Sequence, residues 1–532
     1  MRKAPRHLLT AFAVVALVLA GLAGTTVQAR ASSTVTNPGF NENGATTSPT
    51  GWTTSSTDDT TSASYSEATS EGYDGDDYQL THWSSSAFEV DTYQTLTGLS
   101  SGDYTLGVWT RSNGGDTSNY ISLSGCGGTG TPTNVPVDSD GNWVHIVTYV
   151  DVTTGDCTIN FVTEGNADDW TNYDGVTFTS GSAPIAVRGA DTSSLYRSEL
   201  DGGTYYTSSG TEENAIQQLA SAGMNYVRLR VWVNPGDGFD DEAQMLAGAG
   251  QAASYGEKIY LDIQYSDTWT DPGAQAIPAA WASDTLAELE SQVYTYSYEL
   301  VEALVEQGTR PAMVQVGNEI NVGMLWPYGE LDCSSGCGGW PDLAALLTEG
   351  IDGIKAADSS TEIVLHLATS DDEAYLASWY ETAESYGVPF NVIGLSYYDY
   401  WDGRLDVLQT DLDDLSAEFD KPVMVAETAY PWTLTTDDSS TALSFDDSSE
   451  LDPGYAATPA GQAANFQDVL SVVQAVPDGL GLGAFYWEPT WTVVAGNGWN
   501  PADASSGDGW ENQAMWNYSD TAMPAIADFA AR

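Results

Sequence analysis

The sequence predicts an α/β fold, a (β/α)8 TIM barrel, preceded by an all-β jelly-roll sandwich. The first observation behind this is a change of pattern. Residues 34–180 hold short alternating strands, whereas residues 184–532 hold apolar strands that alternate with helical stretches. The second observation is that the strands of the longer region end in ionisable or aromatic residues, as strands do at the catalytic face of a barrel.

Residues 1–31 have the pattern of a secretory signal peptide. A basic start over residues 2–7 is followed by an apolar run over residues 8–23 and by the small-residue pattern Ala29-Arg30-Ala31. The run of about 16 residues is shorter than the roughly 20 that a membrane span requires. The sequence therefore predicts a secreted, extracellular protein.

The composition is strongly acidic, with 75 Asp and Glu against 15 Lys and Arg and a formal charge of −60. Such a surface repels nucleic acid and anionic membranes, so neither is expected as a partner. It also disfavours a polyanionic substrate such as acidic pectin and favours a neutral polymer. Self-repulsion at this charge predicts a fold that salt stabilises.

Four cysteines in an exported chain predict disulfides rather than metal sites. Pairing Cys126 with Cys157 and Cys333 with Cys337 keeps each bond within one domain. The spacing alone does not prove either pair.

The sandwich region is predicted from three clear strands, at residues 102–110, 143–150 and 157–162. Its five tryptophans are notable because indole rings stack on the apolar faces of sugars. We expect three of them in the core, namely Trp52, Trp109 and Trp143. The candidates for a sugar site are Trp83 beside His82 and the stretch Arg111-Ser-Asn113.

Two ends of this region carry a family resemblance. The opening Asn37-Pro-Gly-Phe40 with Gly51-Trp52, and the closing stretch at residues 170–178, resemble the jelly-roll carbohydrate-binding modules appended to many glycanases. The resemblance implies a polysaccharide-binding module. A short linker of small residues, 179–184, separates it from the barrel region.

The barrel is predicted from eight strands, which are expected at residues 186–191, 225–232, 258–265, 312–319, 362–368, 392–398, 422–428 and 481–488. Eight helices are expected to alternate with them, at residues 211–222, 241–255, 285–307, 341–357, 371–386, 405–419, 459–475 and 523–532. Strict alternation over this length is typical of a TIM barrel.

Two glutamates identify the candidate chemistry. Glu319 follows Asn318 at the end of the fourth strand, and Glu427 ends the seventh. A single strand-end glutamate is usually paired or solvated, but two at facing strand ends are what glycoside hydrolysis requires. We predict Glu319 as the general acid/base and Glu427 as a nucleophile kept ionised by a nearby arginine. Asn318 is expected to bind the 2-hydroxyl of the sugar.

Other strand ends carry charged and aromatic side chains, which implies mutual pairing and a functional site. These residues are Asp191, Arg228, Arg230, Asp262, Asp267, Tyr397, Tyr398, Trp487 and Glu488.

The region from Ala186 onward resembles the arabinogalactan endo-β-1,4-galactanases of glycoside hydrolase family 53. The matching stretches lie at residues 188–191, 226–235, 265–272, 315–321, 426–432 and 485–489. The resemblance implies retaining endo-hydrolysis of β-1,4-galactan without a catalytic cofactor. It also implies that Asp267, Trp269, Tyr398 and Trp487 shape the sugar subsites, beside the strand-end arginines Arg228 and Arg230.

The chain departs from the family at Gln264, where histidine is usual. Glutamine can donate a hydrogen bond but cannot become charged, so subsite affinity or the pH profile is expected to differ. Bacterial relatives also bind structural calcium near the last two strands. Asp437 and Asp438, within an acidic segment over residues 437–459, would supply ligands here. A solvated acidic loop is the commoner structure in so acidic a protein.

Two alternatives stay open. Another endo-hydrolase of the same clan, acting on xylan, mannan or cellulose, would share both glutamates. A non-catalytic carbohydrate-binding protein would have no need of them. We expect a monomer with galactan as its polysaccharide partner.

Overall fold

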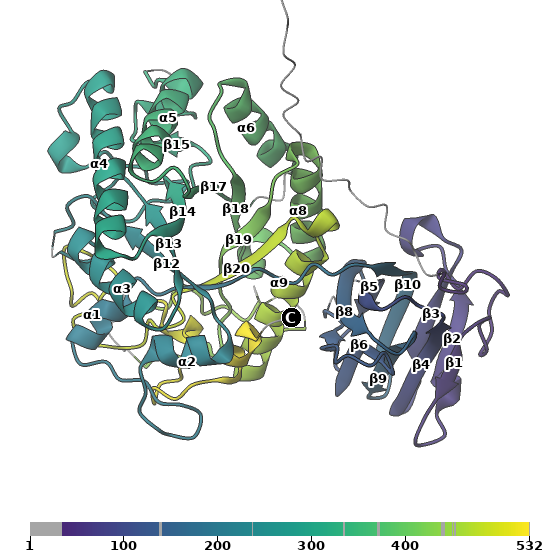
Figure 1. Cartoon of the computed structure of the whole chain (residues 1–532). Coiled ribbons are helices and arrows are strands. Elements are labelled where there is room, and N and C mark those ends of the chain that lie inside the picture. The colour runs from purple at the N-terminus through teal and green to yellow at the C-terminus, as the bar shows by residue number, and fades with distance from the viewer. Residues whose placement is uncertain are drawn as a thin grey trace, which may run out of the picture.

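The computed structural model describes residues 34–137, 141–236, 238–332, 336–369, 373–437, 442–449, 451 and 454–530. Figure 1 shows two bodies side by side, a sandwich of strands in purple and blue and a larger barrel surrounded by helices, from teal to yellow. The predicted signal peptide lies outside the described residues.

The first body consists of two five-stranded antiparallel sheets packed face to face. One sheet has the order β1-β4-β9-β6-β7, with strands Thr53–Ser55, Phe88–Thr97, Asp156–Gly165, Ser118–Ser124 and Thr133–Asn134. The other has the order β2-β3-β10-β5-β8, with strands Ser64–Ala68, Tyr78–Trp83, Trp170–Ser180, Gly102–Ser112 and Val144–Val152. Short 3-10 helices η1 and η2 span Thr61–Ala63 and Tyr73–Gly75.

The core of the sandwich forms because alternate residues of each strand face the opposite sheet. β4 shows this pattern clearly, since every second residue from Phe88 to Leu96 is buried and the residues that alternate with them are more exposed. A disulfide between Cys126 and Cys157 is present, as predicted. The second predicted pair includes Cys333, which lies outside the described residues.

The second body is a closed parallel barrel of eight strands, in which β11 pairs with both β12 and β20. The strands in barrel order are β11 Val187–Asp191, β12 Tyr226–Val231, β13 Lys258–Ile263, β14 Pro311–Val316, β17 Glu362–Ala368, β18 Val392–Ser396, β19 Val423–Thr428 and β20 Gly481–Trp487. A small hairpin, β15 Gly323–Met324 and β16 Gly329–Glu330, follows β14. The predicted TIM barrel and all eight strands are confirmed.

Helices cover the outside of the barrel. They are α1 Leu195–Leu200, α2 Ala215–Ala222, α3 Glu242–Ser254, α4 Leu286–Gln307, α5 Gly339–Ala357, α6 Glu373–Ser385, α7 Asp399–Asp402, α8 Leu405–Phe419 and α9 Pro459–Ala475. Short 3-10 helices are η3 Ala279–Trp281, η4 Pro477–Gly479, η5 Glu511–Gln513 and η6 Pro524–Phe529. The predicted last α-helix is wrong, because η6 is a 3-10 helix of six residues that begins at Pro524 and ends in extended backbone at Ala530.

The barrel interior changes character from one end of the strands to the other. Near the strand starts a compact apolar cluster includes Tyr226, Met313 and Phe485. Two residues further along β12 the inward position is Arg228, and then Arg230, both 1% exposed. The apolar half makes a rigid floor, and the ionisable half lies at the carboxyl ends, where barrel enzymes place their chemistry.

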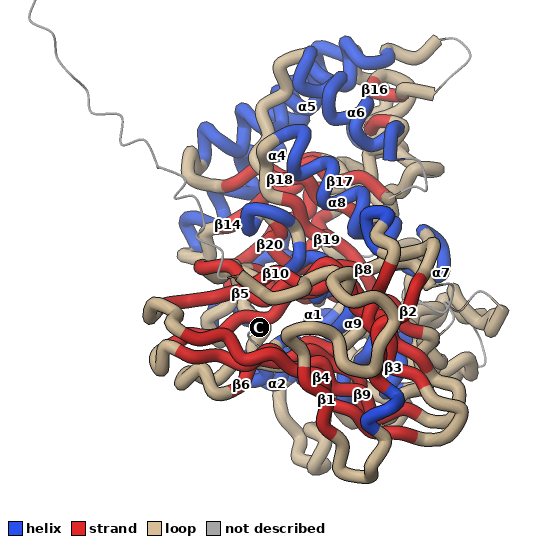
Figure 2. Tube along the Cα trace, turned by 90° about the vertical axis from the view of Figure 1, so that its right-hand side faces the viewer, coloured by secondary structure: helices blue, strands red, loops and turns tan. Residues whose placement is uncertain are grey.

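The sandwich is docked on the barrel through β8, which packs against α9 and α8 (Figure 2). The backbone N–H of His145 donates to Oε1 of Gln409 over 2.8 Å, and Nε2 of Gln409 donates back to the His145 carbonyl over 3.0 Å. Asn134 donates to Gln467 of α9 over 2.9 Å. Within the described residues, no helix is both long and apolar enough to cross a membrane.

Candidate active site

Glu319 lies just beyond the carboxyl end of β14, in a turn that a nearby glycine makes possible. Gly317 has a φ of 79°, and a Cβ there would lie 2.6 Å from Cγ2 of Ile320, so the position requires glycine. Glu319 itself has a φ of 48°. Positive φ is uncommon for a residue with a side chain, and such strain concentrates at functional sites.

Glu427 reaches the cleft through an irregularity in strand pairing. β18 and β19 pair Leu395 with Val425 and then Ser396 with Glu427, so β19 carries one extra residue. Ala426 belongs to the apolar cluster inside the barrel, and strict alternation would turn Glu427 away from the interior. The bulge re-aims Glu427 into the cleft, as bulges beside active sites do.

The two glutamates line the same cavity but have different neighbours. Oε1 of Glu427 lies 2.6 Å from Nη1 of Arg228, and the Tyr398 hydroxyl donates to Oε2 over 3.0 Å. Oε1 of Glu319 forms a 2.6 Å hydrogen bond with the hydroxyl of Ser396. Glu427 therefore has a cation beside it, whereas the contact made by Glu319 is with a neutral group.

Burial raises the pKa of Glu319 to about 8, and the negative charge of Glu427 adds to the rise. Burial also raises the pKa of Glu427, but the Arg228 guanidinium opposes it. Because an adjacent cation favours a charged carboxylate, Glu427 ionises before Glu319. When the pair holds one proton, that proton is therefore on Glu319.

Arg228 lies at the centre of a buried ion-pair network. Its Nη1 is 2.8 Å from Oδ2 of Asp191, and its Nη2 is 3.0 Å from Oδ2 of Asp262. One guanidinium thus serves these two carboxylates and Glu427 together. Buried charges need such partners, because removing one member of a pair leaves the other as an uncompensated charge in the protein interior.

Arg230 forms a second network behind the cleft. Its Nε lies 2.6 Å from Oδ2 of Asp240, it contacts Glu488, and its guanidinium is 4.4 Å from the ring centroid of Trp269. Neither Arg228 nor Arg230 is among the residues that line the cleft. Both predicted substrate-binding arginines therefore lie under the cleft wall and support residues in it.

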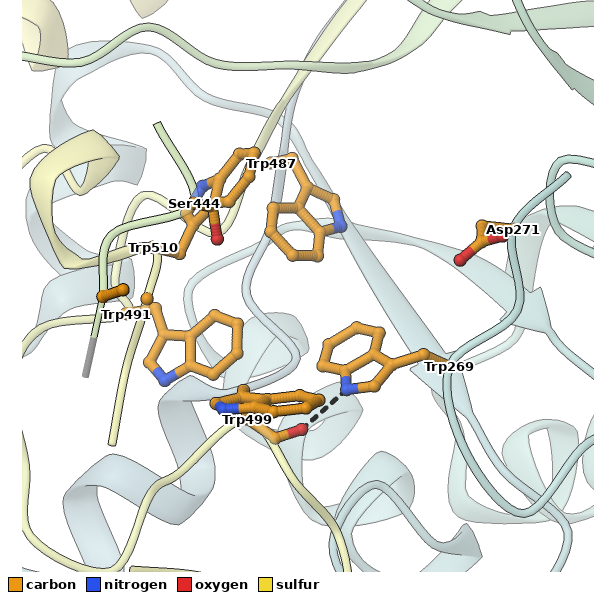
Figure 3. Close-up of a pocket in the computed structure, with 9 residues that line it drawn as sticks. Trp269, Asp271, Ser444, Trp487, Trp491, Trp499 and Trp510 are labelled. Atoms are coloured by element: carbon orange, nitrogen blue, oxygen red, sulfur yellow. Dashed lines mark hydrogen bonds between the residues drawn. The ribbon is translucent and has the colours of Figure 1, made fainter. Parts of the chain in front are cut away.

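The cleft consists of two adjoining cavities, of about 240 Å³ and about 620 Å³. The smaller one contains both glutamates. Four residues line both cavities, so the two are continuous: Trp269, Asp271, Trp487 and Trp510. The larger cavity is surrounded by indole rings, and Nε1 of Trp269 donates to the Trp499 carbonyl over 2.6 Å (Figure 3).

Several predicted residues lie in the cleft as expected. Asn318, Trp269, Tyr398 and Trp487 all line it. Asp267 lies elsewhere, where its carboxylate accepts from the backbone N–H groups of Asn234 and Ala279 over 3.0 and 2.8 Å. Asp267 therefore joins two loops beside the cleft.

Sequence reasoning missed other residues of the cleft wall, which are Thr270, Asp271, Trp401, Ala442, Ser444, Trp491, Trp499, Gly509 and Trp510. Trp401 stands three residues after Tyr398, so its position next to a predicted site residue could have indicated it. Trp491, Trp499 and Trp510 lie in the long loop after β20, which gives no periodic signal.

Gln264 also lines the cleft, and both ends of its amide have partners. Its Oε1 accepts from Nε1 of Trp232 over 2.7 Å, and its Nε2 donates to Oδ2 of Asp262 over 3.0 Å. A neutral imidazole can likewise accept at one nitrogen and donate at the other. Glutamine therefore preserves the hydrogen bonds of the position but offers no charge.

The predicted calcium ligands are only partly described. Asp438 lies outside the described residues, and the backbone N–H of Asp437 donates to Oε1 of Glu511 over 2.7 Å. In the described part of the chain, no group of three or more His, Cys, Asp or Glu is placed to hold a metal. The calcium prediction gains no support from this geometry.

The sandwich has a separate pocket of about 280 Å³ on the outer face of the β2-β3-β10-β5-β8 sheet. Its lining residues are Tyr65, Glu67, Glu71, Thr81, Trp83, Arg111, Gly141, Trp170 and Asn172. Arg111 is fixed at its base by Asn172, Gln79 and the Gly141 carbonyl, over 3.1, 2.9 and 3.1 Å. The two candidates Trp83 and Arg111 are therefore brought together.

The core assignments for tryptophan were right only for Trp52, which is buried. Trp109 is half-buried on the outer face, stacked 3.9 Å from Tyr73 and 5.0 Å from His145. Trp143 is also half-buried, with the Arg111 guanidinium 4.7 Å from its ring. The core predictions for these two rings were wrong, because neighbours on the outer face of the sheet cover them instead of the core. His82 instead points into the core.

Comparison with known proteins finds relatives of the barrel region. A probable arabinogalactan endo-β-1,4-galactanase A of Aspergillus terreus is 36% identical over 332 residues, which are 59% of this chain and 89% of that protein. The endo-β-1,4-galactanase of Bacillus subtilis is 30% identical over 377 residues, 64% of this chain and 85% of that one. The solved catalytic domain of an Ignisphaera aggregans family 53 enzyme is 33% identical with a TM-score of 0.61, covering 66% of this chain and 98% of its own.

Residues 187–529 match glycosyl hydrolase family 53, a span that begins with β11 and ends with η6. The match therefore includes the complete barrel and the cleft with its two glutamates. Together with the galactanase relatives, it shows that this chain is a glycoside hydrolase and belongs to glycosyl hydrolase family 53.

Proposed function

We propose that this protein is a retaining endo-β-1,4-galactanase that cleaves galactan by double displacement. Glu427 attacks the anomeric carbon, and Glu319 protonates the leaving oxygen and then activates water. The observation that carries the proposal is the asymmetry of the pair. Glu427 has Arg228 at 2.6 Å and a donated tyrosine hydroxyl, whereas Glu319 is buried beside a neutral hydroxyl with a raised pKa.

Retention is supported by the closeness of the two carboxylates. They line one cavity of about 240 Å³, and the charge of Glu427 raises the pKa of Glu319. Retaining enzymes hold their carboxyl groups about 5 Å apart, whereas inverting enzymes leave room for water between them. Proton NMR of the fresh product would test this, and an initial α-anomer would overturn it.

Cleavage within the polymer is supported by the aromatic cavity beyond the glutamates. Its indole rings offer stacking faces for several sugar units on one side of the cleaved bond. The galactan preference rests on the names of the relatives and on the acidic surface, which disfavours charged polymers. Hydrolysis of β-1,4-galactan should exceed that of xylan, mannan and cellulose, and a preference for one of those would favour the other clan activities.

We propose further that residues 34–180 are a carbohydrate-binding module for the same polymer, that 184–532 are the catalytic domain, and that residues 1–31 are a signal peptide for secretion. The sandwich pocket with Trp83, Trp170 and Arg111 supports the first point. The disulfide supports an oxidising compartment. Monomeric mass in solution and stabilisation by molar NaCl are expected from the charge of −60.

Calcium at Asp437 and Asp438 remains a prediction from the family resemblance, with no role in catalysis. Chelation with EDTA, followed by a melting curve, tests it. An unchanged melting temperature would leave the acidic loop as solvated.

A further inference from the structure

A chain of hydrogen bonds leads from Arg228 to Glu319, and the orientation of each link can be deduced. The first link is Asn318. Its Nδ2 donates to the Thr270 carbonyl over 2.8 Å, and its Oδ1 accepts from Nη2 of Arg228 over 3.1 Å and from Nε2 of Gln315 over 3.0 Å. The opposite amide orientation would set an N–H group against a guanidinium, so Oδ1 must face inward.

The second link is His366, which is completely buried. Its Nδ1 lies 3.0 Å from Oδ1 of Asn318, and since that oxygen can only accept, Nδ1 carries a proton. Burial, with the positive charge of Arg228, lowers the pKa of His366 well below its usual range. The ring is neutral, so Nε2 has no proton and must accept.

The third link is Ser396, 1% exposed, whose Oγ lies 2.8 Å from Nε2 of His366 and 2.6 Å from Oε1 of Glu319. The hydroxyl has one proton, and Nε2 of His366 requires it. Ser396 therefore turns a lone pair toward Glu319, and a 2.6 Å contact between two oxygens needs a proton from Glu319. An ionised Glu319 would take the serine proton and leave Nε2 of the histidine buried without a donor.

We propose that His366 and Ser396 are positioning residues that hold Glu319 in its neutral, proton-donating form by presenting an acceptor to it. This rests on the proposed acid/base role of Glu319. When substrate binds, the Glu319 proton leaves its hydrogen bond with Ser396 and is transferred to the leaving oxygen, and the Ser396 hydroxyl then rotates to donate to Oε1 of the new carboxylate. When Glu319 takes a proton from the attacking water, the hydroxyl returns to His366.

Other charged groups also act on Glu319. Glu427 on β19, Asp271 on the loop after β13 and Asp402 at the end of α7 all raise its pKa. Arg228 on β12 lies against Glu427, and the Tyr398 hydroxyl donates to Glu427. These groups are the same whichever way the serine proton points. A serine variant therefore separates the effect of the hydrogen bonds through Ser396 on Glu319 from the effect of these charges.

The variant test is Ser396→Ala, with Ser396→Thr to restore the hydroxyl. The measurement is the alkaline limb of kcat/KM on galactan. Loss of the acceptor should move this limb to lower pH by about one unit, and threonine should return it. If the serine normally donates to an ionised Glu319, the limb moves to higher pH instead, which overturns the proposal, as does an unmoved limb.

Ser471→Ala is the matched control, because Ser471 is a buried serine on α9 whose hydroxyl donates to the Gln467 carbonyl over 2.9 Å. It should leave the limb in place. Glu319→Gln separates the two proposals. If this variant still hydrolyses galactan, the proposed function is wrong. If hydrolysis requires Glu319 but the alkaline limb of Ser396→Ala does not move to lower pH, only the proposed role of His366 and Ser396 is wrong.

A second measurement needs no change near the site. The chain has four histidines, so ¹⁵N NMR of histidine-labelled protein can resolve each ring, with His82→Gln and His145→Gln assigning the two sandwich signals. His366 should be the neutral Nδ1–H tautomer in the resting enzyme. An Nε2–H tautomer, or a charged ring at pH 6 to 8, would overturn the proposal even if Ser396→Ala fails to fold.

Discussion

Tryptophan rings line both the cleft of the barrel and the pocket of the sandwich, and a buried arginine pairs with a carboxylate at each site, but the two carboxylates differ in exposure. In the cleft, Arg228 lies 2.6 Å from Glu427, whose side chain is 9% exposed. In the pocket, Arg111 lies 3.4 Å from Glu71, whose side chain is 74% exposed. Water screens the second pair strongly and the first weakly.

This difference separates chemistry from binding. A carboxylate acts as a nucleophile or acid only when its surroundings set its protonation state, and burial beside Arg228 does this for Glu427. The pocket offers stacking faces and a fixed guanidinium, which suit recognition of a sugar. Changes in the cleft should therefore alter hydrolysis, and changes in the pocket should alter binding of the polymer.

The largest effect is expected for Glu427→Gln, which removes the proposed nucleophile and keeps its shape. The rate of galactan hydrolysis should fall by at least about 10³-fold, because no covalent intermediate can form. Binding of insoluble galactan in a pull-down should stay at the wild-type level. Retained hydrolysis would show that the nucleophile is another residue.

Glu319→Ala should reduce kcat on galactan by about 10² to 10⁴-fold, the usual range for loss of an acid/base. An aryl galactoside with a good leaving group needs little protonation, so the rate at which it forms the glycosyl-enzyme intermediate should change little. Added azide should then restore turnover on that substrate. If both substrates slow equally, Glu319 has a different role.

The pH profile of the wild-type enzyme should be bell-shaped. Because Glu319 must be protonated and its pKa is raised to about 8, kcat/KM should fall as pH rises through that value, about tenfold per unit beyond it. The acid limb reports protonation of Glu427. An alkaline limb near the ordinary glutamate pKa would contradict a buried acid.

Arg111→Ala should weaken binding of the full chain to insoluble galactan by about tenfold, since the guanidinium organises the floor of the sandwich pocket. Turnover of short soluble oligosaccharides should not change. Arg310→Ala is the matched control, because that arginine is 58% exposed and pairs with Asp358 at a distant site. Lost turnover on oligosaccharides would show that the two regions act together.

The smallest effect is expected for Gln264→His, because imidazole can replace both amide hydrogen bonds, to Trp232 and Asp262. kcat/KM on galactan should change less than about tenfold at neutral pH, with the difference growing at acid pH as the ring gains charge. A large change at neutral pH would mean that the amide contacts the sugar directly.

The sequence was sufficient for the barrel because its signals are local. Apolar strands alternate with helical stretches along the chain. Glu319 could be found for the same reason, since Gly317 stops the strand two residues before it. The disulfide between Cys126 and Cys157 was predicted because it keeps the bond within one domain, although the spacing alone did not prove it.

Other features were out of reach because they depend on residues far apart in the chain. Trp109 and Trp143 were predicted in the core, yet they lie on the outer face of a sheet, against His145 and Arg111 respectively. Trp491 and Trp499 come from an aperiodic loop that only the closed barrel folds over the cleft.

By itself the sequence determined which elements form and which residue types stand at the strand ends, because hydrophobic period and backbone breaks are written into short stretches. Only the tertiary structure decided which way those residues face. The bulge between β18 and β19 turns Glu427 into the cleft. The orientation of Asn318, His366 and Ser396 is set by Arg228 from another strand, because a hydrogen bond needs one donor and one acceptor.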